Sequence, residues 1–224
     1  LAECKPHGAA RFAWSFGLDY GAFGGVNCDQ YIKDLPLDRV SSDVLIAYEL
    51  NGEPLRPENG YPARLVVPGF YGTNSVKWLS RIEISDRRVD SPFTTRWYND
   101  VVKDAAGNPT GATKPVWQIA PESVIVAPAA EGHLLRGNEF QVWGWSWADG
   151  GISSVELSFD SGNTWVETLL DPARGRSWQR FQYSWIPREA GSFSVCSRAK
   201  GADDSLQPHS GARNAIHTVN FFVD

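Results

Sequence analysis

The sequence predicts a mainly β protein with two domains, and three observations support this prediction. The chain has 224 residues, enough for one or two domains that each bury a core. Helical periodicity is almost absent, whereas short apolar or alternating runs recur between turn signals. The pattern also changes after residues 104–113, which are rich in Ala, Gly, Asn and Pro and are typical of a connection. We therefore expect a domain boundary near residues 112–118.

The first part of the chain carries short strand patterns that are separated by turn residues. We expect strands at 11–16, 44–50, 65–67 and 76–84. A Gly-rich loop is expected at 17–25, followed by a short polar stretch at 31–40. Asn51-Gly52 is a tight-turn signal that follows the run at 44–50. Pro68-Gly69 ends the run at 65–67.

The second part of the chain predicts an antiparallel β-sandwich of immunoglobulin-like type. Seven short strands are expected about 8–15 residues apart, with turn signals between them. They lie at 123–127, 140–147, 154–159, 164–169, 178–185, 191–199 and 218–223. Trp143, Trp145 and Trp147 in the second of these strands are candidates for the sandwich core or for an interface, and we favour the core.

Composition and charge exclude several classes of protein. No run of about 18 apolar residues is present, so no membrane-spanning helix is expected. The formal net charge of −5 argues against nucleic-acid binding and against a basic membrane-binding patch. The three cysteines include no Cys-x-x-Cys pair, and we expect free thiols. The four histidines show no metal-ligand spacing. The sequence contains no Met, and we expect that Leu1 is not the natural start.

Residues 158–165 read SFDSGNTW and fit the S-x-D-x-G-x-T-W pattern of an Asp-box hairpin. In such a turn the Asp carboxylate accepts bonds from backbone N–H groups and the Gly adopts a positive φ. A β-propeller would need several copies of the motif, and the chain has one. We therefore expect a structural hairpin in the sandwich. A glycan-binding role, suggested only by this motif and the 10 Trp, is a minor alternative.

Residues 51–79 carry the most specific motif of the chain and read NGEPLRPENGYPARLVVPGFYGTNSVKWL. This segment resembles the sulfite oxidase family of molybdopterin enzymes, whose signature runs N-G-x-P-L, H-G-[FY]-P-x-R, V-[IV]-P-G and V-K-W-L. Further matching stretches are Gly17-Leu18-Asp19, Leu35-Pro36-Leu37, residues 44–49 and residues 214–217. The resemblance therefore extends over most of residues 11–224.

The resemblance implies that the chain helps to bind a molybdenum–molybdopterin cofactor. Cofactor-binding roles are carried over onto Asp19, Asn59, Arg64, Ser75, Val76 and Lys77. A buried, phosphate-bearing pterin requires cations and oriented N–H donors, which agrees with an Arg and a Lys beside a Pro-Gly-rich loop. Tyr31 matches an active-site tyrosine of the family and is the candidate catalytic residue, with a packing role as the alternative.

The sequence departs from the family pattern at two functional positions. Asn59 stands where the family has His; an amide can donate and accept but does not titrate near pH 7. This difference weakens the assignment of sulfite as the substrate and points toward sulfur-oxidising or unassigned relatives of the family. The metal-ligating Cys of the family lies upstream of residues 17–19, and neither Cys4 nor Cys28 matches it. We therefore assign no metal ligand, and we expect the chain alone to be inactive without an upstream half.

Residues 1–115 are thus interpreted as the C-terminal part of a partial α+β molybdopterin-binding domain, and residues 116–224 as an immunoglobulin-like dimerisation domain. The resemblance implies an oxidoreductase that oxidises a sulfur oxyanion by oxygen-atom transfer at molybdenum. It also implies a homodimer, the upstream half of the same enzyme as a partner, an electron acceptor such as a cytochrome c, and a periplasmic or otherwise exported location. The alternative is a non-catalytic dimerisation module with a vestigial cofactor segment, and molybdenum content distinguishes the two.

Overall fold

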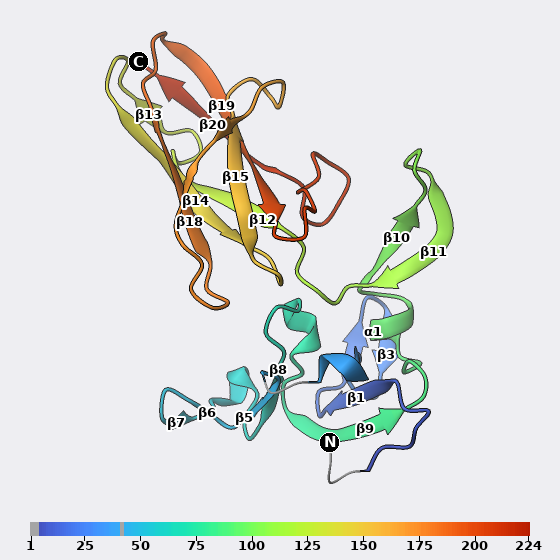
Figure 1. Ribbon diagram of the computed structural model, residues 1–224. Coiled ribbons are helices and arrows are strands. Elements are labelled where there is room, and N and C mark those ends of the chain that lie inside the picture. The colour runs from blue at the N-terminus through green and yellow to red at the C-terminus, as the bar shows by residue number, and fades with distance from the viewer. Residues whose placement is uncertain (1–4, 41–42) are drawn as a thin grey trace. The chain divides into compact units, whose positions relative to one another are not determined.

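The computed structural model describes residues 5–40 and 43–224, so Cys4 lies outside the described part. The chain divides into two compact units, Leu1–Trp117 (unit 1) and Gln118–Asp224 (unit 2) (Figure 1). Both units are built mainly from strands, which confirms the mainly β prediction. In the described residues, no helix has the length and apolar character needed to cross a membrane.

Unit 1 is organised around a three-stranded antiparallel sheet with the order β4-β1-β9. These strands are Ile32–Pro36 (β4), Phe12–Gly17 (β1) and Leu79–Ser85 (β9). The strand expected at 76–84 begins only at Leu79. Trp78 has a φ of 47°, and the Val76 carbonyl accepts a hydrogen bond from Leu65 N at 2.8 Å, so this stretch leaves the sheet to form part of a loop.

Three small ribbons complete the first part of unit 1. They pair Gly21–Phe23 (β2) with Val26–Cys28 (β3), Leu45–Ala47 (β5) with Arg64–Val66 (β8), and Glu49–Leu50 (β6) with Glu53–Pro54 (β7). Asn51 and Gly52 link β6 to β7 with positive φ values of 56° and 83°, as the tight-turn signal predicted. Short 3₁₀ turns lie at Leu37–Arg39, Pro57–Asn59 and Gly72–Asn74. A core of Leu35, Leu65, Val67, Phe70 and Val76 lies beneath them.

A short helix and a β-hairpin end unit 1. The helix α1 spans Pro92–Thr95, and the hairpin pairs Asn99–Lys103 (β10) with Pro109–Pro115 (β11). The stretch 104–113, which was expected to be a connection, is instead the turn and part of the second strand of this hairpin. The Asp104 carboxylate accepts hydrogen bonds from Ala106 N at 2.9 Å and Asn108 N at 2.8 Å, and Gly107 has a φ of 85°, so this stretch forms a tight turn between two strands.

Unit 2 is a sandwich of two sheets. One sheet has the order β12-β14-β18-β17, and its strands are Glu122–Ala127, Phe140–Trp147, Gln179–Trp185 and Leu169–Leu170. The other has the order β13-β20-β19-β15-β16, and its strands are His133–Leu134, His217–Val223, Gly191–Gly201, Ile152–Ser158 and Val166–Glu167. The run at 164–169 is interrupted at Thr168, whose N–H and hydroxyl both bond the Val155 carbonyl, at 3.0 and 2.8 Å.

The core of unit 2 lies between its sheets, and the predicted core position of the three tryptophans is wrong. In β14, Val142, Gly144 and Ser146 are buried, whereas the tryptophans between and after them are only half-buried. A Cβ at Gly144 would collide with the Phe181 ring and the Val124 carbonyl, so the inward face of β14 has no room for a large side chain there. Strand alternation consequently places the tryptophans on the opposite face, where the Arg180 guanidinium lies 4.7 Å from the Trp143 ring.

The Asp-box segment forms the structural hairpin that was expected. The Asp160 carboxylate accepts hydrogen bonds from Thr164 N at 2.9 Å, Thr164 Oγ1 at 2.6 Å and Ser158 Oγ at 2.7 Å. These bonds lower the pKa of Asp160 to about 2. Gly162 has a φ of 89°, and its carbonyl accepts a bond from Trp165 Nε1 at 3.1 Å. The motif's polar groups are therefore used within the turn.

Candidate functional site

Two cavities of unit 1, each of about 270 Å³, share Asp19 and Tyr31 in their walls. The first cavity is otherwise lined by Gly72, Thr73, Ser75, Lys77 and Trp78. The second cavity is otherwise lined by Tyr20, Gly21, Ala22, Phe23, Cys28, Phe93 and Tyr98. The structure thus brings together four of the residues that the sequence assigned to the site, namely Asp19, Tyr31, Ser75 and Lys77.

Backbone hydrogen bonds hold Asp19 between the sheet and the Lys77–Trp78 segment. Gly17 N donates to the Tyr31 carbonyl at 2.8 Å, Tyr31 N donates to the Asp19 carbonyl at 3.0 Å, and Leu18 N donates to the Trp78 carbonyl at 3.0 Å. A Cβ at Gly17 would collide with Asp19 Oδ1 and meet the Lys77 carbonyl at 3.0 Å. A side chain at position 17 would therefore displace the Asp19 carboxylate from its place.

Two cations lie beside the first cavity and bond only carbonyl oxygens. Arg64 donates from Nη1 to the Asn59 carbonyl at 3.2 Å and from Nη2 to the Ser75 carbonyl at 3.3 Å. Lys77 Nζ donates to the Glu58 carbonyl at 2.7 Å. In the described residues, neither cation forms an ion pair with a carboxylate. Their positive charge therefore remains available to an anion.

Gly60 allows these two cationic side chains to start from adjacent positions. It has a φ of 102°, a left-handed conformation that disfavours side chains. A Cβ there would approach the Cβ of Lys77 to 3.0 Å and the Cβ of Arg64 to 3.2 Å. The Asn59-Gly60 step of the motif thus brings Arg64 and Lys77 together.

Several buried polar atoms around the first cavity have no hydrogen-bond partner. In the part of the chain that the structure describes, these atoms include Asp19 Oδ1, Arg64 Nε and Thr73 Oγ1. Buried polar groups normally have partners, so the three atoms indicate that a polar ligand completes this site. Burial raises the pKa of the Asp19 carboxyl, and the nearby Lys77 charge opposes this shift. A cavity with cations, an unpaired carboxylate oxygen and an unpaired hydroxyl fits a group such as a phosphate-bearing pterin, which both donates and accepts.

Tyr31 lies at the junction of the two cavities. Its hydroxyl donates to the Thr73 carbonyl at 2.6 Å, and its ring centroid is 4.4 Å from that of Phe93. Burial, with smaller contributions from Tyr98 and Asp19, raises the pKa of the Tyr31 phenol above its ordinary value. The phenol therefore stays protonated at neutral pH, and its hydrogen bond fixes the wall between the cavities.

The remaining predicted residues take supporting positions. Asn59 and Arg64 do not line the cavities but bond each other, and Arg64 bonds Ser75 of the wall. Ser75 Oγ accepts a hydrogen bond from Val67 N at 3.1 Å. The Val76 side chain is 1 % exposed and belongs to the core of unit 1, so this residue can offer only backbone atoms to a ligand.

Sequence reasoning missed residues from two sources. Thr73 and Trp78 flank the recognised motif positions, and their place inside the motif was a usable signal. Phe93 and Tyr98 follow in a stretch without a clear pattern, and only the fold brings them against Tyr31. Cys28 is a buried free thiol in the wall of the second cavity, and Cys196 is a buried free thiol in unit 2.

Family models match both units. Residues 1–93 match the model described as "Oxidoreductase molybdopterin binding domain". Residues 113–222 match the model described as "Mo-co oxidoreductase dimerisation domain". The two matches together cover most of the chain and assign a molybdopterin site to unit 1, where the cavities lie.

Individual relatives agree with the family models. The chain is 29 % identical over 228 residues to mitochondrial sulfite oxidase of Homo sapiens, covering 90 % of this chain and 42 % of that protein. It is 31 % identical over 216 residues to sulfite oxidase of Gallus gallus, covering 88 % and 46 % respectively. The chain therefore spans less than half the length of these curated relatives.

A solved structure shows the same fold. Sulfane dehydrogenase SoxCD from Paracoccus pantotrophus superposes with a TM-score of 0.75 and 27 % identity, covering 97 % of this chain and 56 % of that chain. The similarity extends through both units, in accordance with the two family models.

Proposed function

Because the chain belongs to the sulfite oxidase family of molybdopterin-dependent oxidoreductases, we propose that it forms the C-terminal portion of an enzyme that oxidises a sulfur compound. The observation that carries this proposal is the set of unpartnered buried atoms, Asp19 Oδ1, Arg64 Nε and Thr73 Oγ1, beside two cations without carboxylate partners. A vestigial segment would have no reason to keep such a site, since each unpaired buried polar group destabilises the fold by about 1–3 kcal/mol.

Arg64 and Lys77 hold the anionic part of the cofactor in this proposal. Both guanidinium and ammonium groups form strong bonds to phosphate oxygens, and Arg64 keeps an unused Nε–H donor. Asp19 and Thr73 supply an acceptor and a hydroxyl at the cavity wall, where a pterin ring has matching donors and acceptors. When bound, the molybdenum cofactor supplies the two-electron oxygen-atom transfer chemistry.

The second cavity is the proposed substrate side. Tyr31 contributes to both cavities, and its protonated phenol is suited to orient groups at their junction. Aromatic side chains of Phe23, Phe93 and Tyr98 also line this wall, and the Phe23 and Phe93 ring centroids lie 5.6 Å apart. The substrate is a small sulfur oxyanion in this assignment.

Further proposals concern the whole protein. Unit 2 would form a homodimer, as its match to a dimerisation domain suggests. Electrons would pass to an acceptor such as a cytochrome c, and the enzyme would act in the periplasm or outside the cell. Catalysis would also need the upstream half of the enzyme, so this chain alone would be inactive.

A sulfane sulfur compound is a second candidate substrate. Asn59 replaces the His of the family motif, and the similar solved structure is a sulfane dehydrogenase. Arg64 donates to the backbone carbonyl of Asn59, which any side chain at this position keeps, so Asn59→His changes the side chain without removing this bond. Parallel turnover assays with sulfite and with a sulfane compound, using wild type and Asn59→His, separate the two assignments. Faster turnover of sulfite than of the sulfane compound by the wild type would reject the second candidate.

The cofactor assignment is tested by replacing the two cations. We expect Arg64→Met and Lys77→Met each to weaken cofactor retention about tenfold or more, because a hydrogen bond to a charged group contributes about 1.5–3 kcal/mol. The measurement is the molybdenum and pterin content of the full protein after gel filtration. Arg81→Met is the matched control, since Arg81 is exposed, pairs with Glu83 at 3.6 Å, lies 3.8 Å from the Phe16 ring and lines neither cavity. Full retention of the cofactor in both Arg64→Met and Lys77→Met, or the absence of molybdenum from the wild type, would contradict the assignment and favour a non-catalytic module.

A further inference from the structure

Lys33 is a buried ammonium group outside the family motif, and among the described residues no carboxylate forms an ion pair with it. It lies on β4, and the residue is 1 % exposed. Its neighbour Asp34 is 0 % exposed, but both Asp34 oxygens bond Arg88, at 2.8 Å from Nε and 3.1 Å from Nη2. Strand alternation directs Lys33 to the opposite face, so the acidic group beside it in sequence does not neutralise it.

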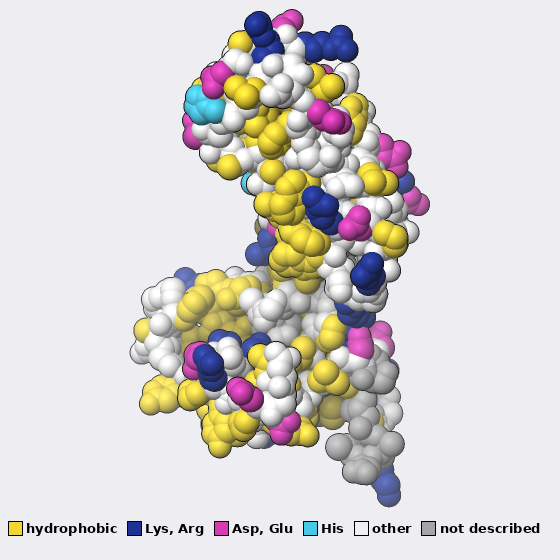
Figure 2. Space-filling model, turned by 90° about the vertical axis from the view of Figure 1, so that its left-hand side faces the viewer, with side chains coloured by type: hydrophobic (Ala, Val, Ile, Leu, Met, Phe, Trp, Pro, Cys, Tyr) yellow, Lys and Arg dark blue, Asp and Glu magenta, His cyan; other side chains and the backbone are white. Residues whose placement is uncertain are grey.

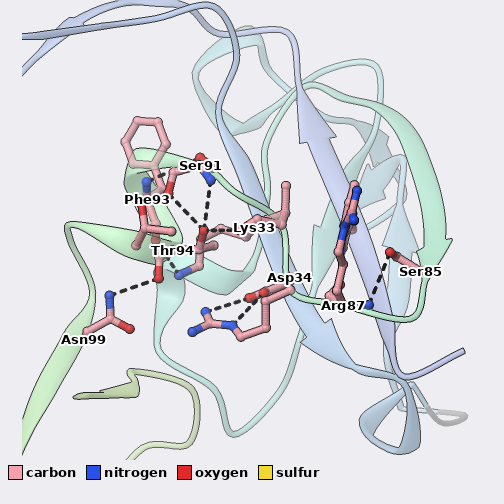
Figure 3. A network of polar contacts seen from close by, with 12 residues as sticks. Lys33, Asp34, Ser85, Arg87, Ser91, Phe93, Thr94 and Asn99 are labelled. Atoms are coloured by element: carbon pink, nitrogen blue, oxygen red, sulfur yellow. Dashed lines mark hydrogen bonds and ion pairs between the residues drawn. The ribbon is translucent and has the colours of Figure 1, made fainter. Parts of the chain in front are cut away.

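The Lys33 ammonium has two contacts, and both lie on the segment that walls the second cavity. Nζ donates to the Phe93 carbonyl in α1 at 3.1 Å, and Nζ lies 5.1 Å from the centre of the Tyr98 ring. Figure 3 shows Lys33 reaching toward this helix while Asp34 bonds an arginine elsewhere. An ammonium has three donors, so one carbonyl and one ring face leave it incompletely satisfied.

The segment that Lys33 contacts is otherwise held by backbone caps. Ser91 Oγ accepts a hydrogen bond from Phe93 N at 3.3 Å, and Thr94 Oγ1 donates to the Val89 carbonyl at 2.6 Å (Figure 3). Asn99 Nδ2 bonds the carbonyls of Thr94 and Trp97, both at 3.0 Å. These bonds stabilise α1, but none of them contacts the Tyr98 ring.

Tyr98 itself adopts an unfavourable backbone conformation. Its φ is 56°, a left-handed value that is uncommon for a bulky residue, and its side chain lines the second cavity beside Tyr31. A conformation of this kind persists only when the surroundings hold it in place. The cation over the ring is one such restraint, because a desolvated cation attracts an aromatic face.

We propose that Lys33 is a positioning residue that holds Tyr98 and α1 at the wall of the substrate cavity. It touches neither cavity, so its effect on the reaction passes through Phe93 and Tyr98. A purely structural role explains the observations less well, since replacing a buried, unpaired ammonium by an apolar side chain of similar length often leaves stability unchanged or increases it. The catalytic consequence rests on the proposed function, whereas the position of Tyr98 does not.

The charge of Lys33 also provides a test in the unmodified protein. Burial lowers the pKa of the Lys33 ammonium to about 8, while Asp34 raises this pKa and Arg88 lowers it further. The groups that face Nζ are the Phe93 carbonyl and the Tyr98 ring. The charge, and with it the attraction to the Tyr98 ring, is therefore lost as the pH rises through about 8.

Carbon-13 NMR of the full protein, labelled at the tyrosine Cζ, measures this effect. Tyr98→Phe assigns the Tyr98 signal. We expect this signal to show a small step near pH 8 in the wild type, well short of the shift that phenol ionisation gives. Lys33→Met should move the signal at pH 7 and abolish the step. Arg96→Met, which removes an exposed cation 5.5 Å from the Trp97 ring, should do neither. An unmoved Tyr98 signal in the wild-type titration would overturn the proposal, whether or not the variant folds.

Turnover by the holoenzyme provides the second readout. We expect Lys33→Met to lower kcat/KM about tenfold to a hundredfold, in line with the effect of misplacing a group near the reacting atoms, and the wild-type rate to fall above about pH 8. Unchanged molybdenum content and an undiminished urea midpoint should accompany the loss. If the Tyr98 carbon-13 signal shows its step near pH 8 but the holoenzyme turns over no sulfur compound, the proposed function is rejected and the positioning of Tyr98 by Lys33 is supported. Turnover that Lys33→Met leaves unchanged would reject the role of Lys33 in the reaction.

Discussion

The two units differ in their buried polar groups, because only unit 1 keeps buried polar atoms without a partner among the described residues. In unit 2, Ser123 Oγ donates to Gln207 Oε1 at 2.7 Å, and Ala199 N donates to the same oxygen at 3.0 Å. In unit 1, Asp19 and Arg64 keep unpaired buried atoms, and all five unpaired atoms of the described residues belong to this unit. Three of the five, Asp19 Oδ1, Arg64 Nε and Thr73 Oγ1, belong to residues at or beside the first cavity, whereas the polar groups of unit 2 serve the fold.

The apolar residues show the same difference. Unit 2 has one core of 11 buried residues, whereas the cluster in unit 1 has 5. Unit 1 also exposes more large hydrophobic side chains than unit 2, with Leu45, Ile46, Tyr48 and Leu50 of the β5–β6 region each more than half exposed. Figure 2 shows such side chains at the surface. Unit 1 therefore has the smaller apolar cluster and the larger number of exposed apolar side chains among the described residues.

The largest effect expected from this comparison is in the core of unit 2. Phe181 is 0 % exposed, so Phe181→Ala should lower the free energy of unfolding by about 3–5 kcal/mol. Urea denaturation measures the loss. Leu169→Ala, in the neighbouring strand but 65 % exposed, should cost about 0.5 kcal/mol or less. If Phe181→Ala and Leu169→Ala lower the free energy of unfolding equally, the buried core of unit 2 does not contribute more to stability than its surface.

An intermediate effect is expected where unit 1 does pair its buried charges. Arg88→Met leaves the fully buried Asp34 without its bidentate partner, and should lower the free energy of unfolding by about 3 kcal/mol. The double variant Asp34→Leu/Arg88→Met should recover most of the loss, because it leaves no buried carboxylate without its arginine partner. If the double variant is no more stable than the single one in urea denaturation, packing rather than the unpaired charge explains the loss.

The smallest effect concerns pH. His217 Nδ1 accepts a hydrogen bond from Ile125 N at 3.0 Å, and burial lowers the His217 pKa below its ordinary 6.5. The contribution of His217 to stability is thus complete above pH 6.5 and is lost as the pH falls toward the folded-state pKa. The urea midpoint of unit 2 should decrease between pH 7 and pH 5. His217→Gln, which keeps an acceptor but cannot titrate, should show a weaker decrease; an identical pH dependence would assign the effect to other groups.

Much of the fold was predictable because local patterns and tertiary packing agree. All seven strand regions expected in unit 2 contain strands, since each has an inward apolar face that only one register can bury. The turn at Asn51-Gly52 was predictable from its two residues alone. The prediction failed at 104–113, where polar and Gly-rich strands of an exposed hairpin have no apolar alternation to reveal them.

The motif residues of the candidate site were predictable in part, and their arrangement was not. Asp19, Tyr31, Ser75 and Lys77 line one cavity, as the motif indicated that they would act together. Val76 instead faces the core, because neighbouring side chains of an extended segment point in opposite directions. Lys33 and Tyr98 are 65 positions apart, and no sequence period connects them.

The sequence by itself determined the strand-rich fold class, the tight turns and four of the residues that line the first cavity, because these depend on side-chain pattern, local backbone preference and the motif. Only the tertiary structure decided which polar atoms remain unpaired, that the tryptophans of β14 face outward, and that a buried lysine lies against Tyr98. These properties depend on what surrounds each side chain in space, and burial sets both the pKa of Lys33 and the energetic consequence of every unpaired group.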